Sequence, residues 1–178
     1  MSFVKILSEK IETKKLWDAS LVLERNEFLK TRGSINTDLY FITEGSLRIF
    51  VIDESEEHTI RFGYKNNFIT SLDSFITGQV SQSYIQALKK TYLKVISKES
   101  FFKFLKTASE NNEIWRQILE QLVVQQLERE IDILTSSPHD RYRRVLKRSP
   151  QLFQEIPNKY IASYLRMTPE TLSRIKKS

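Results

Sequence analysis

The 178-residue sequence contains no cysteine. The absence of thiols excludes disulfide bonds, thiolate zinc sites and cysteine-ligated iron–sulfur clusters. The sequence also lacks any run of about 18 apolar residues, so we expect no membrane span. Its first residues show no apolar stretch followed by a small-residue cleavage site, which argues against secretion and favours the cytoplasm.

Motifs for catalysis are also missing. There is no glycine-rich phosphate loop, no Ser/His/Asp order in a recognisable context, and no His/Asp/Glu spacing typical of a metal site. His58 and His139 lie far apart in the sequence, and such isolated histidines are more often ordinary surface residues than ligands. We therefore expect no catalytic residues, no metal and no enzymatic activity.

Short apolar runs separated by turns occupy the first half of the chain. Residues 3–17 carry apolar side chains at roughly helical spacing, which predicts short helices, and strand-like alternation follows from Leu21 to about Ile96. The chain's four glycines all fall between such runs, where a positive φ is cheap only for glycine: Gly33, Gly45, Gly63 and Gly78. Many short strands with glycine turns predict a small antiparallel barrel or roll.

A helical region follows the predicted strands. Ser97 is suited to cap a short helix, and residues 112–134 predict one long helix without glycine or proline. Its apolar stripe ends in the 3–4–3 spacing of a coiled-coil seam, and we predict dimerisation through six residues: Trp115, Ile118, Leu122, Leu127, Ile131 and Leu134. Packing of this stripe against the chain's own barrel is the alternative. Ser136-Ser137-Pro138 ends the helix and marks a domain boundary.

Charge is distributed unevenly along the chain. The net charge is +6, yet residues 138–178 contain ten basic and only three acidic side chains, so residues 1–137 are slightly acidic. A compact basic segment attracts polyanions, because each neutralised phosphate releases condensed counterions. An ordinary solvated charged face is the alternative interpretation.

The segment from Ile156 to Lys177 has the pattern of a helix-turn-helix. Five apolar residues predict the facing sides of its two helices: Ile161, Ala162, Leu165, Leu172 and Ile175. The turn is Arg166-Met167-Thr168, with Met167 between the helices. Thr168 is suited to cap the second helix and Pro169 to begin it.

Three side chains on the outer face of the second helix can read bases. Arg174 can bond guanine bidentately, Glu170 can accept from a cytosine amino group, and Ser173 can bond either a base or a phosphate. A surface ion pair between Glu170 and Arg174 is the alternative. The predicted DNA-binding set comprises these residues and their neighbours: Thr168, Glu170, Thr171, Ser173, Arg174, Lys176 and Lys177.

The sequence resembles the Crp/Fnr family of transcription regulators, particularly its Bacteroidetes-type members. The resemblance covers nearly the whole chain and includes Tyr40–Arg48, the long helix, Ile161–Leu165 and Thr168–Ile175. It implies an α+β fold with three parts: a cyclic-nucleotide-binding-like β-roll (jelly roll) sensor domain over residues 1–110, a dimerisation helix over 111–136, and a winged helix-turn-helix DNA-binding domain over 137–178.

The resemblance also assigns roles within the second helix and the turn. In the Fnr-type branch a Glu-x-x-Ser-Arg pattern reads the DNA half-site, and Glu170, Ser173 and Arg174 match that pattern. Arg166 stands where the family usually has glycine. A left-handed backbone at this position would cost about 1 kcal/mol.

The chain departs from the family's nucleotide-binding motif. Members that bind cyclic AMP carry Phe-Gly-Glu and a later arginine, whereas Ile69, Thr70 and Ser81 stand at those positions here. Loss of the arginine removes a charge-assisted phosphate contact worth about 1.5–3 kcal/mol. We therefore expect neither cyclic AMP nor cyclic GMP as a cofactor, and the identity of any other effector stays open. The candidate effector pocket consists of five residues: Phe68, Thr70, Ser81, Gln82 and Tyr84.

Together these features predict a homodimeric, cytoplasmic transcription regulator that binds DNA in a sequence-specific way. The expected partners are a second copy of the chain, double-stranded DNA with an inverted repeat and, as a further candidate, RNA polymerase. An inverted repeat is expected because two-fold symmetry in the DNA site mirrors two-fold symmetry in the protein. The competing interpretation is a degenerate β-roll dimer that serves as a protein-interaction module and does not read DNA.

Overall fold

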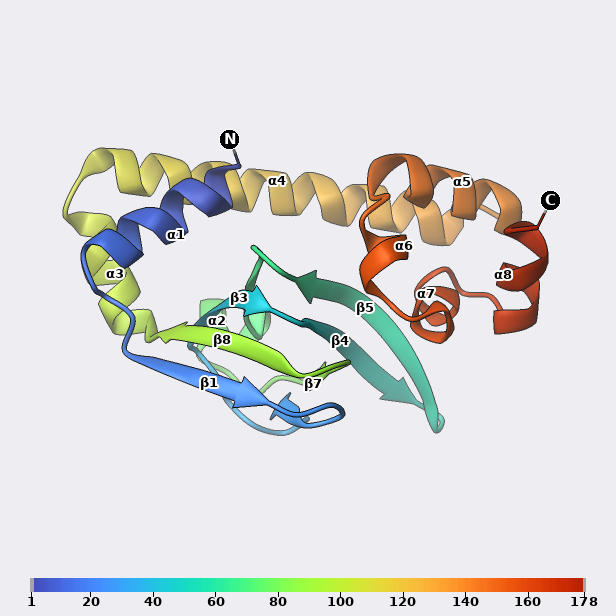
Figure 1. Ribbon diagram of the computed structural model, residues 1–178, viewed down its shortest axis with the longest axis horizontal. Helices are drawn as coiled ribbons and strands as arrows, with labels where there is room; N and C mark the ends of the chain where they lie inside the picture. Colours follow the sequence, from blue (N-terminus) through green and yellow to red (C-terminus); the bar gives the residue numbers. More distant parts are fainter. Residues whose placement is uncertain (1, 178) are drawn as a thin grey trace.

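The computed structural model describes residues 2–177, which form a β-roll, a long helix and a helical C-terminal region (Figure 1). The helices are α1 (Phe3–Thr13), α2 (Leu72–Thr77), α3 (Lys98–Lys106), α4 (Ser109–Leu134), α5 (Pro138–Arg148), α6 (Leu152–Glu155), α7 (Asn158–Tyr164) and α8 (Pro169–Ile175). The strands are β1 (Ala19–Leu23), β2 (Phe28–Lys30), β3 (Leu39–Glu44), β4 (Ser46–Asp53), β5 (Glu56–Tyr64), β6 (Phe68–Ile69), β7 (Tyr84–Ala87) and β8 (Thr91–Ile96).

The strands form two four-stranded antiparallel sheets that enclose a core. The strand order is β1-β8-β3-β6 in one sheet and β2-β7-β4-β5 in the other. Side chains from both sheets meet between them, among them Ile42, Leu47, Ile85 and Leu93, each at most 1% exposed. The antiparallel roll predicted from the alternating pattern is thus confirmed.

The glycines divide into two kinds. Gly33, Gly45 and Gly78 have positive φ angles, as predicted, and at Gly45 a Cβ atom would stand 2.4 Å from the Thr91 hydroxyl. The prediction was wrong for Gly63, which lies inside β5 and has no positive φ. A Cβ there would come within 2.8 Å of Ile42 Cδ1, so this glycine allows β3 to approach β5 closely.

Helices precede and follow the strands in the sequence. A single helix, α1, occupies most of the first predicted helical segment, and α3 is capped as expected, with Ser97 accepting from the Ser100 N–H at 3.3 Å. The sequence pattern missed α2, which interrupts the strands after β6. Six residues make less than two helical turns, too few to show a helical period.

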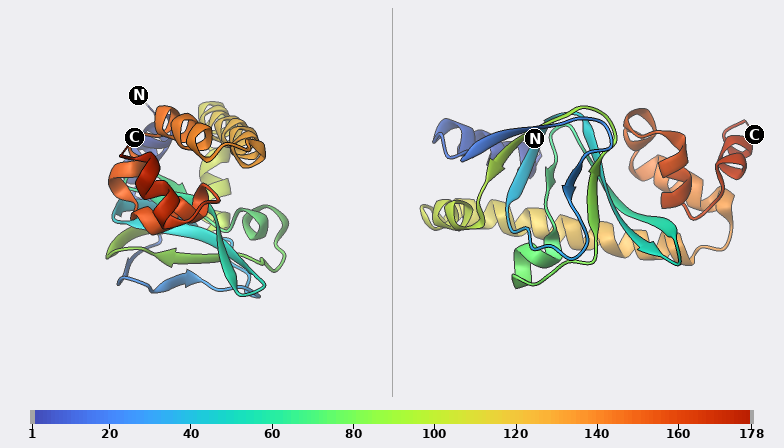
Figure 2. Two further views of the ribbon diagram at one scale, coloured as in Figure 1. Left: turned by 90° about the vertical axis from the view of Figure 1, so that its right-hand side faces the viewer. Right: turned by 90° about the horizontal axis from the view of Figure 1, so that it is seen from below.

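The long helix α4 runs the length of the molecule along one side of the roll (Figure 2, right). Its first turns are fixed by amide side chains, since Asn111 and Asn112 donate to the carbonyls of Phe104 and Leu105 at 3.2 and 2.9 Å. It begins at Ser109 and ends at Leu134, where the sequence placed its end. None of the described helices is long and apolar enough to cross a membrane.

The C-terminal helices share a core with the roll. Val145, Leu152 and Leu165 pack in one cluster with Phe62 and Leu88, which come from the roll. Ser137 caps α5 by accepting from the Asp140 N–H at 3.3 Å. The implied wing strands do not occur among the described residues, because only residues 176 and 177 follow α8 there.

Candidate nucleic-acid interface and sensor cavity

The helices α7 and α8 form a two-helix unit at one end of the molecule (Figure 2, left). Four of the apolar residues predicted to face inward are at most 1% exposed: Ile161, Ala162, Leu165 and Leu172. Met167 is half-buried and packs against the same core, and Ile175 is half-buried as well. Thr168 caps α8 by accepting from the Thr171 N–H at 3.2 Å, and Pro169 occupies the first helical position.

The turn between α7 and α8 is strained and clamped. Arg166 has a φ of 51°, so its backbone is left-handed where glycine would be favourable. The buried Arg141 side chain donates to the carbonyls of Leu165 and Arg166 at 2.8 and 3.1 Å. It also donates to the carbonyls of Thr135 and Ser136, at 2.7 and 3.0 Å. One guanidinium therefore joins the end of α4 to the turn.

The predicted base-reading side chains share an open face of α8. Glu170, Ser173 and Arg174 are all exposed, whereas Leu172 faces the core. Hydrogen bonds from its own backbone N–H and from the Thr168 hydroxyl lower the pKa of Glu170, so its carboxylate is available as an acceptor at neutral pH. This face can present an anion, a hydroxyl and a guanidinium side by side.

The other predicted DNA contacts have differing local roles. Thr171 is half-buried, and its hydroxyl lies 3.2 Å from the Thr168 hydroxyl. Lys176 donates to Asn158 Oδ1 at 3.0 Å, which ties the end of α8 to the start of α7. Lys177 is exposed. Of these three side chains, the two lysines are the ones placed to meet a phosphate backbone.

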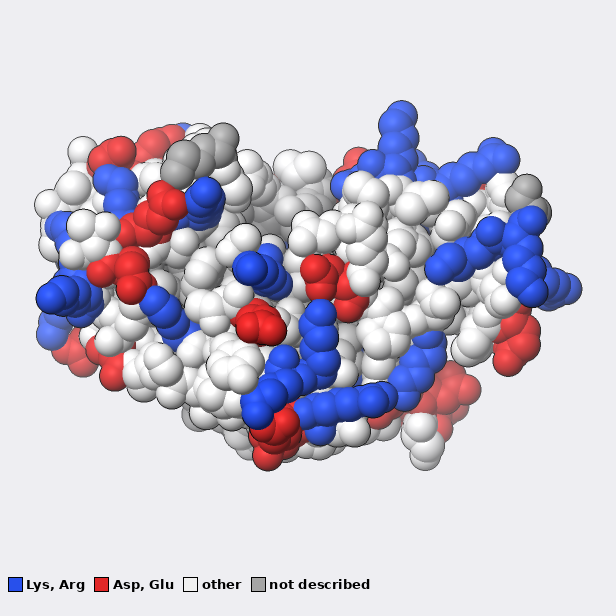
Figure 3. All heavy atoms as spheres, viewed as in Figure 1, with Lys and Arg blue, Asp and Glu red and all other residues white. Residues whose placement is uncertain are grey.

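Basic side chains gather over the end of the molecule that carries α5 and α8 (Figure 3). Seven of the ten basic residues in the C-terminal segment are exposed: Arg143, Lys147, Lys159, Arg166, Arg174, Lys176 and Lys177. The other three, Arg141, Arg144 and Arg148, bond within the protein. The sequence counted all ten as one basic segment, and the structure leaves seven of them exposed to solvent.

An ion-pair network fixes α5 against the end of α4. The fully buried carboxylate of Asp132 lies between Arg144, whose Nε is 3.0 Å away, and Arg148, which also bonds it. Glu128 accepts from the same two arginines at 2.9 and 3.2 Å. Two carboxylates thus balance two guanidinium groups, and the network sets the angle at which the C-terminal helices leave α4.

A second set of contacts docks α7 on the β4–β5 hairpin. The buried Arg48 donates to Gln86 Oε1 at 2.8 Å and pairs with Glu57 at 2.6 Å. Its guanidinium also lies 4.4 Å from the centroid of the Tyr160 ring. The Ser163 hydroxyl donates to the Glu57 carbonyl at 3.0 Å. The roll and the helix-turn-helix are therefore held in one orientation.

The structure places the six predicted dimerisation residues on two faces of α4. Trp115 and Ile118 pack against the chain's own core, with the rings of Trp115 and Phe101 4.9 Å apart, and Leu122 lines a cavity. The remaining three residues, together with Val124, form an exposed apolar stripe: Val124, Leu127, Ile131 and Leu134, with Leu134 83% exposed. Packing against the chain's own fold, the alternative interpretation, therefore describes Trp115, Ile118 and Leu122, and dimerisation stays a prediction for the exposed residues.

A cavity of about 680 Å³ lies between α4 and the roll. Phe68 and Thr70 line it, as the sequence suggested. The other three predicted pocket residues lie elsewhere. The Ser81 hydroxyl lies 2.9 Å from that of Ser83, Gln82 accepts from Arg32 at 2.7 Å, and Tyr84 stacks on Phe50 with ring centroids 5.1 Å apart.

Other residues that line the cavity were not predicted from the sequence. They include Arg61 on β5 and Leu119, Gln125 and Arg129 on α4. Nothing in the local sequence sets them apart, because each resembles an ordinary strand or helix residue until α4 is folded across the roll. Among the described residues, no group of three His, Asp or Glu side chains is arranged to hold a metal ion.

The architecture combines a roll, a long helix that borders a cavity against the roll, and a C-terminal helix-turn-helix. The profile of the cyclic nucleotide-binding domain family matches residues 20–108. The chain belongs to this family, and its fold is that of the Crp/Fnr regulators, as the resemblance implied. No curated protein matches the chain significantly in sequence.

Solved structures share the fold at low sequence identity. FixK2 from Bradyrhizobium japonicum superposes with a TM-score of 0.73 at 13% identity, covering 89% of this chain and 82% of its own. The c-di-GMP-responsive global regulator CLP of Xanthomonas campestris gives 0.71 at 14% identity, covering 96% and 90%. A CooA mutant from Carboxydothermus hydrogenoformans gives 0.71 at 14% identity, covering 99% and 83%. The similarity extends over the roll and the C-terminal helices.

Proposed function

We propose that this chain is a cytoplasmic transcription regulator that binds DNA in a sequence-specific way as a homodimer. The observation that carries the proposal is the open face of α8, where Glu170, Ser173 and Arg174 are exposed above the buried Leu172. The first residues of a recognition helix are those that enter the major groove. The exposed basic side chains around this face supply the contacts to phosphate that position a protein on DNA.

The homodimer rests on the exposed stripe of α4. Val124, Leu127, Ile131 and Leu134 keep the 3–4–3 spacing of a two-helix seam and are each about half exposed or more. A stripe of this kind on a water-facing helix is stabilised when a second copy covers it. The proposed dimer presents two α8 helices related by a two-fold axis, which requires an inverted repeat in the DNA.

Selection from a random-sequence DNA pool tests this function. The purified chain is mixed with the pool at low salt, bound DNA is amplified over successive rounds, and the enriched sequences are titrated by fluorescence anisotropy. Enrichment of an inverted repeat whose half-sites are about one helical turn apart is the expected result. If no sequence is enriched at low salt, the protein-interaction module becomes the better interpretation.

The proposed regulator does not use cyclic AMP or cyclic GMP as its effector. Ile69 is buried in the roll core, the Thr70 hydroxyl donates to the Asp38 carbonyl at 2.8 Å, and the Ser81 side chain is fully buried. None of these residues offers a cation to a phosphate or a carboxylate to a ribose. Isothermal titration of either nucleotide into the protein is expected to show no binding at micromolar concentration, and a measurable heat of binding there would contradict this.

A further inference from the structure

The side chain of Arg141 joins the ends of two helices that are not consecutive in the chain. Its guanidinium donates to the carbonyls of Thr135 and Ser136, the first two residues after α4, at 2.7 and 3.0 Å. It also donates to the carbonyls of Leu165 and Arg166, the first two residues after α7, at 2.8 and 3.1 Å. One buried group therefore bonds the same two positions beyond each helix.

Contacts of this kind hold two helix ends at one distance. The carbonyls at the end of an α-helix have no partner within the helix, and they carry the negative end of its dipole. A guanidinium between two such ends satisfies four acceptors with one cation, and its planar fork fixes the directions in which the acceptors lie. Its removal would leave these partly buried carbonyls without that donor, which is unfavourable.

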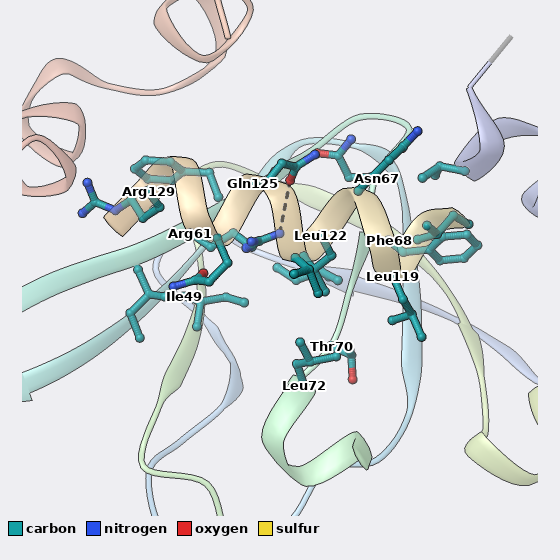
Figure 4. Close-up of a pocket in the computed structure, with 18 of the residues that line it drawn as sticks. Ile49, Arg61, Asn67, Phe68, Thr70, Leu72, Leu119, Leu122, Gln125 and Arg129 are labelled. Atoms are coloured by element: carbon teal, nitrogen blue, oxygen red, sulfur yellow. Dashed lines mark hydrogen bonds between the residues drawn. The ribbon is translucent and has the colours of Figure 1, made fainter. Parts of the chain in front are cut away.

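The end of α4 that Arg141 bonds is itself held against the roll. Arg61 on β5 donates to Gln125 Oε1 at 3.4 Å, the contact drawn as a dashed line in Figure 4. One turn further along α4, Arg129 donates to the Thr59 carbonyl, also at 3.4 Å. The last turns of α4 therefore keep their place beside β5 and give the turn before α8 a fixed support.

Other contacts hold the C-terminal helices at different places. The ion pairs of Asp132 hold α5 one to two turns beyond Arg141. The Ser163 hydroxyl holds the last turn of α7 on the β4–β5 hairpin. Neither set involves residues 165–168, the turn from which α8 starts. Among the described residues, the hydrogen bonds that tie this turn to the end of α4 come from Arg141.

The Arg141 contacts lie between the proposed dimer seam and the recognition helix. Leu134, the last residue of the exposed stripe, directly precedes Thr135, and Arg166 lies two residues before Thr168, the cap of α8. The distance of α8 from a two-fold axis along the stripe therefore depends on this guanidinium. Because displacements add across the axis, a shift of about 1.7 Å in each protomer changes the separation of the two α8 helices by about 3.4 Å, one base-pair step.

We propose that Arg141 is a positioning residue that sets the length of the spacer between the two half-sites. It fixes α8 relative to the stripe, so the dimer accepts an inverted repeat of one spacer length and discriminates against the neighbouring lengths. One base pair changes the separation of the half-sites by about 3.4 Å and their relative rotation by about 35°. A rigid pair of recognition helices can follow neither change. This inference rests on the proposed function and adds a determinant of specificity that contacts no base.

A series of inverted repeats tests the proposal on the full chain. The repeat enriched by selection is remade with spacers one and two base pairs longer and shorter, and each DNA is titrated by fluorescence anisotropy at one salt concentration. The wild type is expected to bind the enriched spacer about tenfold more tightly than its neighbours. Arg141→Met, which removes every donor, should lower this ratio to about threefold or less. A wild type that binds all spacers equally would overturn the proposal.

Arg141→Lys separates the charge from the geometry. Lysine keeps the cation but not the planar fork, so it should broaden the spacer preference as well, though less than methionine does. This variant carries the test alone if circular dichroism shows that Arg141→Met does not fold. A lysine variant with the full wild-type ratio would then contradict the assigned role.

Two controls separate positioning from a general loss of stability. Val145→Ala truncates a fully buried side chain of α5 that lies outside the Arg141 contacts, so it should keep the ratio between spacers. Arg143→Met changes an exposed arginine of the same helix and should keep the ratio too. If Val145→Ala broadens the preference as much as Arg141→Met, or if Arg141→Met weakens every spacer equally, Arg141 is a structural residue and the proposal is wrong.

The two proposals fail in different ways in this experiment. If selection enriches no inverted repeat, the proposed function fails and the role of Arg141 in spacing fails with it. If a repeat is enriched and Arg141→Met keeps the wild-type spacer ratio, the regulator stands and only the role of Arg141 is overturned.

Discussion

Arg174 and Lys177 both lie exposed near the end of α8, yet they should contribute to DNA binding in different ways. Arg174 belongs to the base-reading face, so Arg174→Ala should cost about 1–3 kcal/mol at one base pair and relax specificity there. Anisotropy titrations against a selected site and its single-base-pair variants, at fixed salt, measure this loss.

Lys177→Ala is the control for that variant. A lysine on the phosphate backbone contributes equally to every sequence, so its loss should weaken all sites alike and reduce the salt dependence by about one counterion. If Arg174→Ala also weakened every sequence equally, Arg174 would be a phosphate contact and the assigned role would be wrong.

The turn residue Arg166 offers a test of stability. Its φ of 51° is left-handed, so Arg166→Gly should raise the free energy of unfolding by about 1 kcal/mol. The carbonyl that accepts from Arg141 is retained in the variant. Urea unfolding measures the change, and Arg143→Gly in the exposed part of α5 should lower stability by a similar amount. A destabilised Arg166→Gly protein would show that the Arg166 side chain makes up for the strained backbone.

Residue-scale prediction from the sequence succeeded where the determinants are local. The cap at Thr168, the exposed Glu170 and Arg174, and the left-handed Arg166 depend on neighbours within one or two turns. The buried arginines were missed because their partners are distant in the chain. Arg141 was counted only as charge, although it precedes the fully buried Val145 by four residues and so lies on the same helical face.

At the scale of elements, α4 serves two surfaces at once. Its inward face covers the cavity and its outward face carries the apolar stripe. Substituting Leu127 and Ile131 together by Glu should prevent dimerisation, because four carboxylates would meet across the seam. Equilibrium sedimentation at micromolar concentration is expected to give the mass of a monomer for the variant and of a dimer for the wild type.

The same variant should also lose affinity for an inverted repeat while keeping weak binding to half-sites. Ile76→Glu is its control, because Ile76 is an exposed isoleucine that lies on α2, away from the stripe. A monomeric wild-type protein would contradict the dimer, and so would an unchanged mass for the double variant.

Prediction of the elements failed where an element is too short to show a period, or where a residue's role depends on neighbours distant in the sequence. The helix α2 is too short for a period to show, and Gly63 serves close packing inside β5 because Ile42 lies directly above it. The long helix α4 and its end at Leu134 were predicted well, since many residues repeat one pattern there. The apolar residues of α4 that face the roll could not be distinguished from those that face water, because the distinction depends on where the roll lies.

At the scale of the whole molecule, the buried Asp132 joins the long helix α4 to the C-terminal helices. Asp132→Asn removes the charge that pairs with Arg144 and Arg148, so it should lower the free energy of unfolding by about 2–3 kcal/mol. Urea unfolding measures this loss. Glu130→Gln, an exposed change on the same helix, should stay within about 0.5 kcal/mol of the wild type. An Asp132→Asn protein as stable as that control would show that α5 is held by its apolar contacts alone.

The length of α4 has a mechanical consequence. Its 26 residues span about 39 Å, and amide side chains anchor its first turns to α3. Such a rod acts as a lever, so a tilt of about 5° at the anchored end carries the far end through about 3.4 Å. That distance equals the rise between successive base pairs along one strand of DNA. A small rotation of α4 that also released α7 from the β4–β5 hairpin would therefore shift the register of α8 against a half-site by one step, without any change inside the helix-turn-helix.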